Sequence, residues 1–195
     1  MALALPARAA TAPIPPAPIP LQTLELSGAS FPGLAGPSHL QLLANAKEWA
    51  RHFLHESRRA EIREEAENAA DGFEEGLVEG FRTRGVTRAE YEAQVFAAPR
   101  GAVHEVTKWT GEERARDRGH PSLAISHLSG LPDSVVFSEF YFLPEEGVTN
   151  VVLADGRCWL HVSAISNHVT QRAQSERPMI ALARRIATRF TPTCA

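Results

Sequence analysis

The chain has 195 residues, of which 44% are hydrophobic and 22% are charged, close to the average for globular domains. Its formal net charge of -3 offers no basic surface to nucleic acid or anionic lipid, so we expect no nucleic-acid partner. No apolar run approaches the ~18 residues that cross a bilayer, so we expect no membrane span. A chain of this length is expected to form one hydrophobic core.

Residues 1–37 contain eight of the fourteen prolines and predict an extended N-terminal arm, because proline resists helix formation. Residues 1–12 have two interpretations. Their short apolar stretch and A-x-A-like triplets are typical of the end of a secretory signal, and an Ala-rich disordered segment would have the same composition. Residues 38–195 are predicted to form a single domain.

Within the arm, residues 19–26 alternate imperfectly between apolar and polar residues, a pattern that allows a short edge strand. Extended arms bind other proteins by polyproline docking or by adding a strand to a sheet. We therefore expect a protein partner to bind five residues of the arm: Pro18, Ile19, Leu21, Leu24 and Leu26.

Helical spacing begins at Ser38, which forms an S-x-x-Q capping box with Gln41, and predicts one long helix that ends near Arg82 and Gly85. Apolar residues that recur every three or four positions predict a buried stripe: Leu42, Ala46, Trp49, Phe53, Ile62, Ala66, Ala69, Phe73, Leu77 and Phe81. The glutamates off this stripe are expected to form a solvated surface rather than a metal site: Glu61, Glu64, Glu65, Glu67, Glu74 and Glu75.

The middle of the chain mixes strand and helix patterns. Residues 88–96 alternate and predict a strand, although Thr87 and Glu90 also form a capping box, so a short helix is the alternative. Residues 102–109 have the apolar spacing of a short helix, and a charged loop is expected at 111–119. One side of the predicted strand is apolar: Ala89, Tyr91, Ala93 and Val95.

The second half of the chain reads as strands joined by tight turns, and Asp155-Gly156 between two apolar runs is a hairpin signal. The expected strands are residues 122–128, 134–143, 148–154 and 157–165. Ser175 is the expected N-cap of a final helix. This helix should turn one face to the core: Met179, Leu182, Ala183, Ile186 and Phe190.

Strands joined by tight hairpins imply an antiparallel sheet with helices packed on it. We therefore predict an α+β fold: an antiparallel sheet of four to five strands packed against the long N-terminal helix and the C-terminal helix, with the extended arm in front.

Cys158 and Cys194 are the two cysteines of the chain, too few for a zinc site and not spaced as a C-x-x-C redox pair. A disulfide between them would tether the C-terminus to a strand and would require an oxidising compartment. The alternative is two unrelated free thiols.

Known catalytic and cofactor motifs are missing, so we expect no cofactor, no metal and no catalytic constellation. His52 and His55 do not match a metallopeptidase helix, and we interpret their spacing as coincidence. His161 shares a face with Trp159 and Ser163 on the predicted last strand. It is either a core or solvent-facing histidine or a site residue.

Gly72, Gly76 and Gly80 would line one ridge of the predicted long helix and let another backbone approach closely. The approaching backbone would belong either to the protein's own sheet or to a second chain.

Three features of this sequence occur in a known class of domain. They are Gly72-Phe73 late in a helix, a strand at 91–96 that runs into residues 98–102, and the turn at 130–134 before paired strands. In this combination the chain resembles actinobacterial secreted and lipoprotein-type domains, including extracellular sensor domains of serine/threonine kinases. The resemblance implies an extracytoplasmic, non-catalytic binding domain.

We expect a secreted, non-enzymatic interaction or adaptor domain, for example a subunit of a secreted bacterial assembly that engages a protein partner through the arm. A small-ligand sensor is the first alternative, and it requires a concave pocket with convergent polar groups. An enzyme with an unrecognised site is the second, with His161, Glu139 or Asp155 as its candidate residues. A cytoplasmic location is the alternative to secretion.

Overall fold

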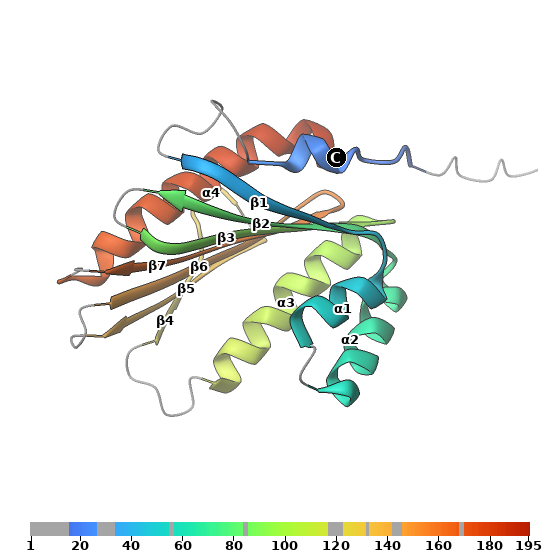
Figure 1. Cartoon of the computed structure of the whole chain (residues 1–195), viewed down its shortest axis with the longest axis horizontal. Coiled ribbons are helices and arrows are strands. Elements are labelled where there is room, and N and C mark those ends of the chain that lie inside the picture. Colours follow the sequence, from blue (N-terminus) through green and yellow to red (C-terminus); the bar gives the residue numbers. More distant parts are fainter. Residues whose placement is uncertain are drawn as a thin grey trace, which may run out of the picture.

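The computed structural model describes residues 16–26, 34–54, 57–83, 86–116, 123–131, 133–141, 146–167 and 170–195. In these ranges the chain forms a seven-stranded antiparallel sheet with helices on both faces (Figure 1). The strand order is β1-β2-β3-β7-β6-β5-β4. The strands are β1 (Leu34–Leu43), β2 (Phe73–Thr83), β3 (Val86–Phe96), β4 (Leu123–Ser126), β5 (Ser134–Tyr141), β6 (Glu146–Asp155) and β7 (Cys158–Asn167).

The helices divide between the two faces of the sheet (Figure 1). On one face lie α4 (Arg172–Cys194) and the short 3-10 helix η1 (Leu21–Leu24). On the other lie α1 (Ala46–Leu54), α2 (Arg58–Asp71) and α3 (Pro99–Arg116). Two separate hydrophobic clusters fill the spaces between the sheet and these layers. No helix in the described ranges combines the length and the apolar composition that crossing a bilayer requires.

The α+β class and the antiparallel sheet are confirmed, and residues 88–96 form a strand rather than a short helix. Alternation along β3 turns its apolar side toward α4, as predicted. The hairpin after β6 and the four predicted strands of the second half are also confirmed. The inward residues of the C-terminal helix are all buried as expected: Met179, Leu182, Ala183, Ile186 and Phe190.

The prediction of one long N-terminal helix is wrong. This error accounts for the two strands, β1 and β2, that are missing from the predicted count. Ser38 lies within β1, and the chain then forms α1, α2 and β2 in turn. Leu77 and Phe81 are buried in β2 against the α4 cluster. Residues four positions apart share a face in a strand as well as in a helix, so their spacing could not distinguish the two.

The predicted glycine ridge on that helix is also wrong. Gly72 ends α2 as its C-cap, whereas Gly76 and Gly80 lie in β2. The glycine series therefore runs from the end of a helix into a strand, where Gly76 leaves room for the Trp49 ring.

The buried stripe predicted through α2 faces solvent instead. Ile62 is 54% exposed, and Ala66 and Ala69 are exposed as well. Glu64, which we expected at a solvated surface, points toward α3 and pairs with Lys108. The face of α2 that packs inward is therefore polar, because its neighbour on α3 is a lysine.

Two helix boundaries differ from the predicted ones. α3 begins at Pro99, before the predicted start at residue 102, since proline suits the first turn of a helix. This helix runs on to Arg116, through part of the predicted charged loop. Ser175 is buried inside α4, where its hydroxyl donates to the Arg172 carbonyl, and Gln171 is the N-cap.

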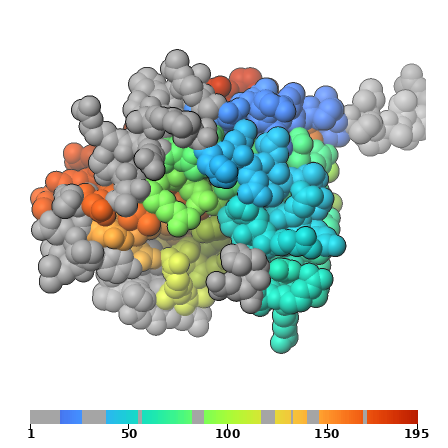
Figure 2. Space-filling model, viewed as in Figure 1, coloured from blue at the N-terminus to red at the C-terminus, as the bar shows by residue number. Residues whose placement is uncertain are grey.

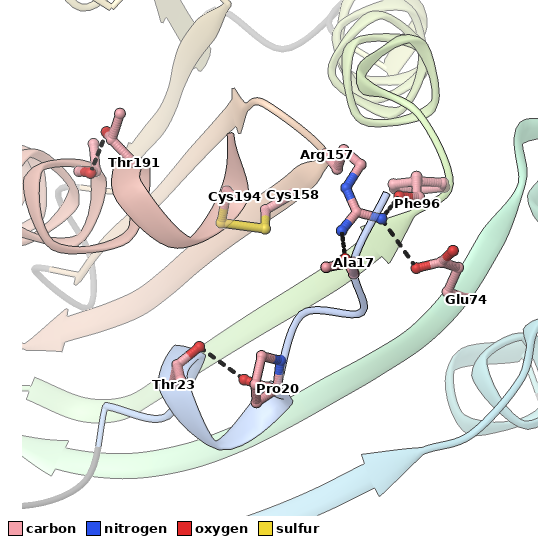
Figure 3. Close-up of a disulfide and its surroundings, with 10 residues drawn as sticks. Ala17, Pro20, Thr23, Glu74, Phe96, Arg157, Cys158, Thr191 and Cys194 are labelled. Carbon is pink, nitrogen blue, oxygen red and sulfur yellow. Dashed lines mark hydrogen bonds and ion pairs between the residues drawn. A yellow bond between two sulfur atoms is a disulfide. The ribbon is translucent and has the colours of Figure 1, made fainter. Parts of the chain in front are cut away.

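Cys158 and Cys194 form a disulfide that joins the start of β7 to the last residue of α4, with Cα atoms 5.4 Å apart (Figure 3). The adjacent hairpin holds the same end of the helix, since the Arg157 amide donates to the Cys194 carbonyl at 2.7 Å. Gly156 has φ 54° in this turn, and a Cβ there would come within 2.0 Å of the Cys194 oxygen. The end of α4 is therefore bonded to and packed against the β6–β7 turn.

Residues 16–26, which belong to the predicted arm, pack on the sheet beside α4. They form η1 rather than the expected edge strand, because Leu21 and Leu24 at i and i+3 both turn into the core. The Leu26 amide donates to the Glu79 carboxylate at 2.8 Å, and Arg157 donates to the Ala17 carbonyl at 2.5 Å (Figure 3). The segment is drawn in blue near the top of the molecule (Figure 2).

Replacing Leu24 tests whether this segment is part of the core. Leu24 has no exposed surface, so Leu24→Ala should lower the free energy of unfolding by about 2–5 kcal/mol through lost burial and the cavity left behind. Gln22→Ala, at an exposed position of the same turn, should change it by less than about 0.5 kcal/mol. Guanidinium unfolding measures both, and equal stability of the two variants would contradict the packing described.

Removing the disulfide tests how strongly it tethers the C-terminus. The cysteines are 36 positions apart, so the Cys158→Ala/Cys194→Ala variant should lose about 4 kcal/mol, chiefly because its unfolded chain is less constrained. The measurement is guanidinium unfolding of variant and wild type, each with and without reductant. Reductant should destabilise the wild type alone, and a response of the variant would indicate some other cause.

Candidate functional site

A cleft of about 170 Å³ opens between the sheet and the layer of α1, α2 and α3. We call it the tryptophan cleft. Its floor comes from β3 and β7: Glu92, Gln94 and Trp159. Its walls come from the three helices: Trp49, Phe53, Leu54, Glu64, Glu105, Lys108, Trp109 and Glu112.

The floor of the cleft is set by the register of β3 against β7. Gln94 is paired directly with Trp159, and two residues along each strand Glu92 is paired with His161. Side chains two residues apart lie on the same face of a strand. Four large polar or aromatic side chains therefore rise side by side toward the helices.

All three tryptophans of the chain meet here. The Trp49 and Trp159 rings are 6.2 Å apart and nearly perpendicular, at 86°. Trp109 lies 6.0 Å from Trp159 at 35°, and 4.6 Å from the His161 ring. Gly76 makes room for this arrangement, because a Cβ at that position would lie 2.5 Å from Trp49 Cε3.

Two polar atoms of the floor carry no hydrogen bond to any described residue. They are Gln94 Oε1, an acceptor, and Trp159 Nε1, a donor, and both side chains are only 1% exposed. A buried polar group without a partner typically costs about 1–3 kcal/mol. Both atoms belong to directly paired residues of the floor, and other side chains cover them.

His161 lies beside the floor, with Nε2 donating to Asn150 Oδ1 at 3.1 Å. Its Nδ1 is 3.2 Å from a Glu92 carboxylate oxygen, an ion-pair distance whose angle is not that of a hydrogen bond. In the neutral ring with the proton on Nε2, Nδ1 is an acceptor, and in the protonated ring it is a cationic donor facing Glu92.

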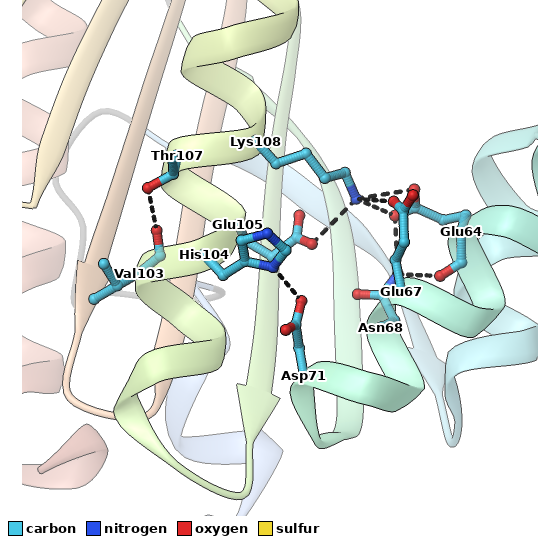
Figure 4. Close-up of polar contacts among 9 residues, drawn as sticks. All are labelled: Glu64, Glu67, Asn68, Asp71, Val103, His104, Glu105, Thr107 and Lys108. Carbon is cyan, nitrogen blue, oxygen red and sulfur yellow. Dashed lines mark hydrogen bonds and ion pairs between the residues drawn. The ribbon is translucent and has the colours of Figure 1, made fainter.

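A lysine and two glutamates connect α2 with α3 at one wall (Figure 4). Lys108 Nζ donates to both oxygens of Glu64, at 2.8 and 2.9 Å, and to Glu105 at 3.1 Å. Burial raises the pKa of Glu105 to about 7, an effect that Lys108 opposes and Glu64 reinforces. Beside them, His104 Nδ1 lies 2.5 Å from Asp71 and makes a second contact between the two helices.

Of the three residues suggested for an enzyme, only His161 lies beside the cleft, in contact with its lining residues Glu92 and Trp109. Glu139 pairs with Arg116 at 2.6 Å, and Asp155 stands at the end of β6, opposite Cys158. None of the contacts described for these three joins two of them.

His52 lies against Phe53, and His55 is outside the described residues. Within the described ranges no three His, Cys, Asp or Glu side chains are grouped so that they could hold a metal ion.

Among the predicted arm residues, Pro18 is exposed. The other four are buried against the chain's own core: Ile19, Leu21, Leu24 and Leu26.

Four lining residues are not predicted as site residues from the sequence: Trp49, Trp109 and Lys108 in the wall of the cleft, and Gln94 in its floor. The polar side of the 88–96 strand was visible in the sequence as Glu92 and Gln94. Buried strands carry polar residues rarely, so their position opposite a Trp-x-His strand could have suggested a site.

No family model matches the chain, and no curated protein matches it. Among solved structures, the fold is similar to the extracellular domain of PknH from Mycobacterium tuberculosis. The match has 10% sequence identity and a TM-score of 0.49, and it covers 86% of this chain and 92% of that one.

The buried carboxyl of Glu105 makes stability depend on pH. Its pKa is about 7 in the folded protein against an ordinary 4.5, so the folded state holds more protons between these values, and stability falls as pH rises through that window. Glu105→Gln should remove this component, which is on the order of 1–3 kcal/mol. Unfolding from pH 4 to 8 compares it with wild type and with Glu65→Gln, a change outside the cleft that should keep the wild-type slope.

Proposed function

We propose that this chain is an extracytoplasmic, non-catalytic sensor domain that binds a small molecule in the tryptophan cleft. The observation that carries the proposal is the meeting of three tryptophans with an unused buried donor and an unused buried acceptor. Ligand sites are typically concave and mainly apolar, with a few polar groups that fix the orientation of the ligand.

A ligand that hydrogen-bonds to Gln94 or Trp159 would offset the penalty that these residues now carry, once the side chains that cover the two atoms shift. Such pairing favours ligands with matching groups, because an analogue without them leaves both atoms unsatisfied. The geometry therefore supports selective binding of one class of molecule.

The disulfide supports a location outside the cytoplasm. Disulfides between structural cysteines form and persist in oxidising compartments and are rare where thiols are kept reduced. Cys158 and Cys194 are both fully buried, away from the exposed setting of reactive redox cysteines.

A partner that binds the arm remains a prediction, and the packing sets a condition on it. Such a partner would have to lift Leu24 and Leu26 out of the core and break the contact of Leu26 with Glu79. The sensor interpretation leaves residues 16–26 in place, because the cleft lies on the other face of the sheet.

The test is a small-molecule screen read by the indole N–H signals in NMR spectra. Because every tryptophan lies at the cleft, a bound molecule should shift these signals directly. Trp109→Ala should weaken a confirmed hit by at least about tenfold, which corresponds to 1.4 kcal/mol. Val103→Ala, on an exposed part of the same helix, should leave its affinity unchanged. Hits that bind without moving any indole signal would refute the proposed site.

A further inference from the structure

We infer that the ligand of the tryptophan cleft is a small organic cation, an alkylated ammonium compound held by tryptophan faces and by the carboxylates around them. This inference rests on the proposed function and adds the chemical class of the ligand.

The charge of the lining favours a cation. Four acidic side chains line the cleft, Glu64, Glu92, Glu105 and Glu112, against the single ammonium of Lys108. The lining stays net negative even when Glu105 is protonated, as it partly is near its pKa of about 7. Lys108 is already engaged, since it donates to Glu64 at 2.8 Å and to Glu105 at 3.1 Å. An anionic ligand would therefore meet excess negative charge and no unengaged ammonium in the lining.

Two of the carboxylates are not balanced by Lys108. Glu112 makes no ion pair with any described residue and is exposed at the mouth side of α3. Glu92 is 93% buried on the floor beside His161 Nδ1, which is a charge partner only when the ring is protonated. With the ring neutral, a buried carboxylate faces the cleft without a cation, and a positive ligand would supply one.

The aromatic lining suits the same ligand. A cation over the face of a tryptophan is attracted by the ring quadrupole, and tryptophan is the strongest of the aromatic side chains in this respect. Trp49 and Trp159 pack against each other and are 3% and 1% exposed, so the aromatic surface that a ligand can reach in the cleft comes from Trp109 and Phe53. Aromatic faces next to carboxylates recognise quaternary ammonium groups in general.

The size of the cleft agrees with a ligand of this kind. Its volume is about 170 Å³, and a cavity of about 150 Å³ accepts a molecule as large as benzene. A trimethylammonium group with a short substituent is in this range.

The experiment titrates the full chain with tetramethylammonium, choline and Nε-trimethyl-lysine, and with 3,3-dimethyl-1-butanol, the uncharged carbon analogue of choline. The readout is the indole N–H signals, with affinities confirmed by calorimetry. At least one ammonium compound should bind, and choline should bind at least tenfold more tightly than its neutral analogue. Equal binding of the two, or binding of none of the three cations, would overturn the inference.

Two substitutions separate charge from packing. Glu92→Gln keeps the shape of the floor and should weaken ammonium binding about fivefold or more, while leaving the neutral analogue unaffected. Glu65→Gln removes a carboxylate of α2 that does not line the cleft and should change neither. Unchanged ammonium affinity in Glu92→Gln also counts against the inference. If Glu92→Gln does not fold, weakening of choline binding by salt, with no effect on the neutral analogue, replaces it as the measurement.

The failure of this inference can be told apart from the failure of the proposed function. If neutral or anionic compounds from the screen shift the indole signals and lose affinity in Trp109→Ala, the cleft is a ligand site and only the cationic class is wrong. If neither the screen nor the ammonium series moves these signals, both are wrong.

Discussion

The pairing of β3 with β7 at the centre of the sheet determines what each face of the molecule can do. Its register places Ala93 and Leu160 in the cluster under α4, and it places Gln94 and Trp159 under α3. A shift of one residue in one strand would exchange its two faces and bury the polar set in the apolar cluster. The apolar core and the cleft therefore depend on the same backbone hydrogen bonds.

The face under α4 is built for stability. The disulfide fixes the end of α4, and residues 16–26 close the edge of the same cluster. Glu79 is fully buried there, and the Leu26 amide supplies its hydrogen bond. Burial raises the pKa of the cross-strand neighbour Tyr91 well above its ordinary value, and Glu79 adds to the effect. Without the N-terminal segment this polar pair would lose a donor in an apolar environment.

The opposite face accepts polar groups that a core optimised for stability would avoid. Unpaired atoms on Gln94 and Trp159 and a carboxyl at Glu105 with its pKa near 7 lie around one cleft. Departures from the usual pairing of buried polar groups concentrate at functional sites in natural proteins. Tyr91 and Glu79 on the α4 face also carry buried atoms without a partner among the described residues, so what distinguishes the opposite face is the cleft and its three tryptophans.

The elements that could be predicted from the sequence are those marked by patterns within a few neighbouring residues. Alternation identified β3 and its apolar side, Asp155-Gly156 identified the β6–β7 hairpin, and the spacing from Met179 to Phe190 identified the buried face of α4. These predictions succeeded because period and turn chemistry act over a few residues. The pairing of Cys158 with Cys194 was one of two alternatives, since a disulfide also requires proximity.

Three features depend on contacts between distant parts of the chain and could not be predicted from the sequence. They are the secondary structure of residues 38–83, the burial of residues 16–26 and the cleft. Leu77 and Phe81 fit a helix and a strand equally well, and pairing with β1 and β3 selected the strand. Nothing in the sequence indicates which surface the leucines of the arm contact, and in the structure they pack against α4 and β2. Trp49 and Trp109 are 60 positions apart in sequence, and Trp109 and Trp159 are 50 apart. They meet because the sheet order places β7 beside β3 under α3, with α1 packed on the neighbouring strands β1 and β2. Long-range contacts of this kind leave no periodic trace in the sequence, because the chain between them can take any length.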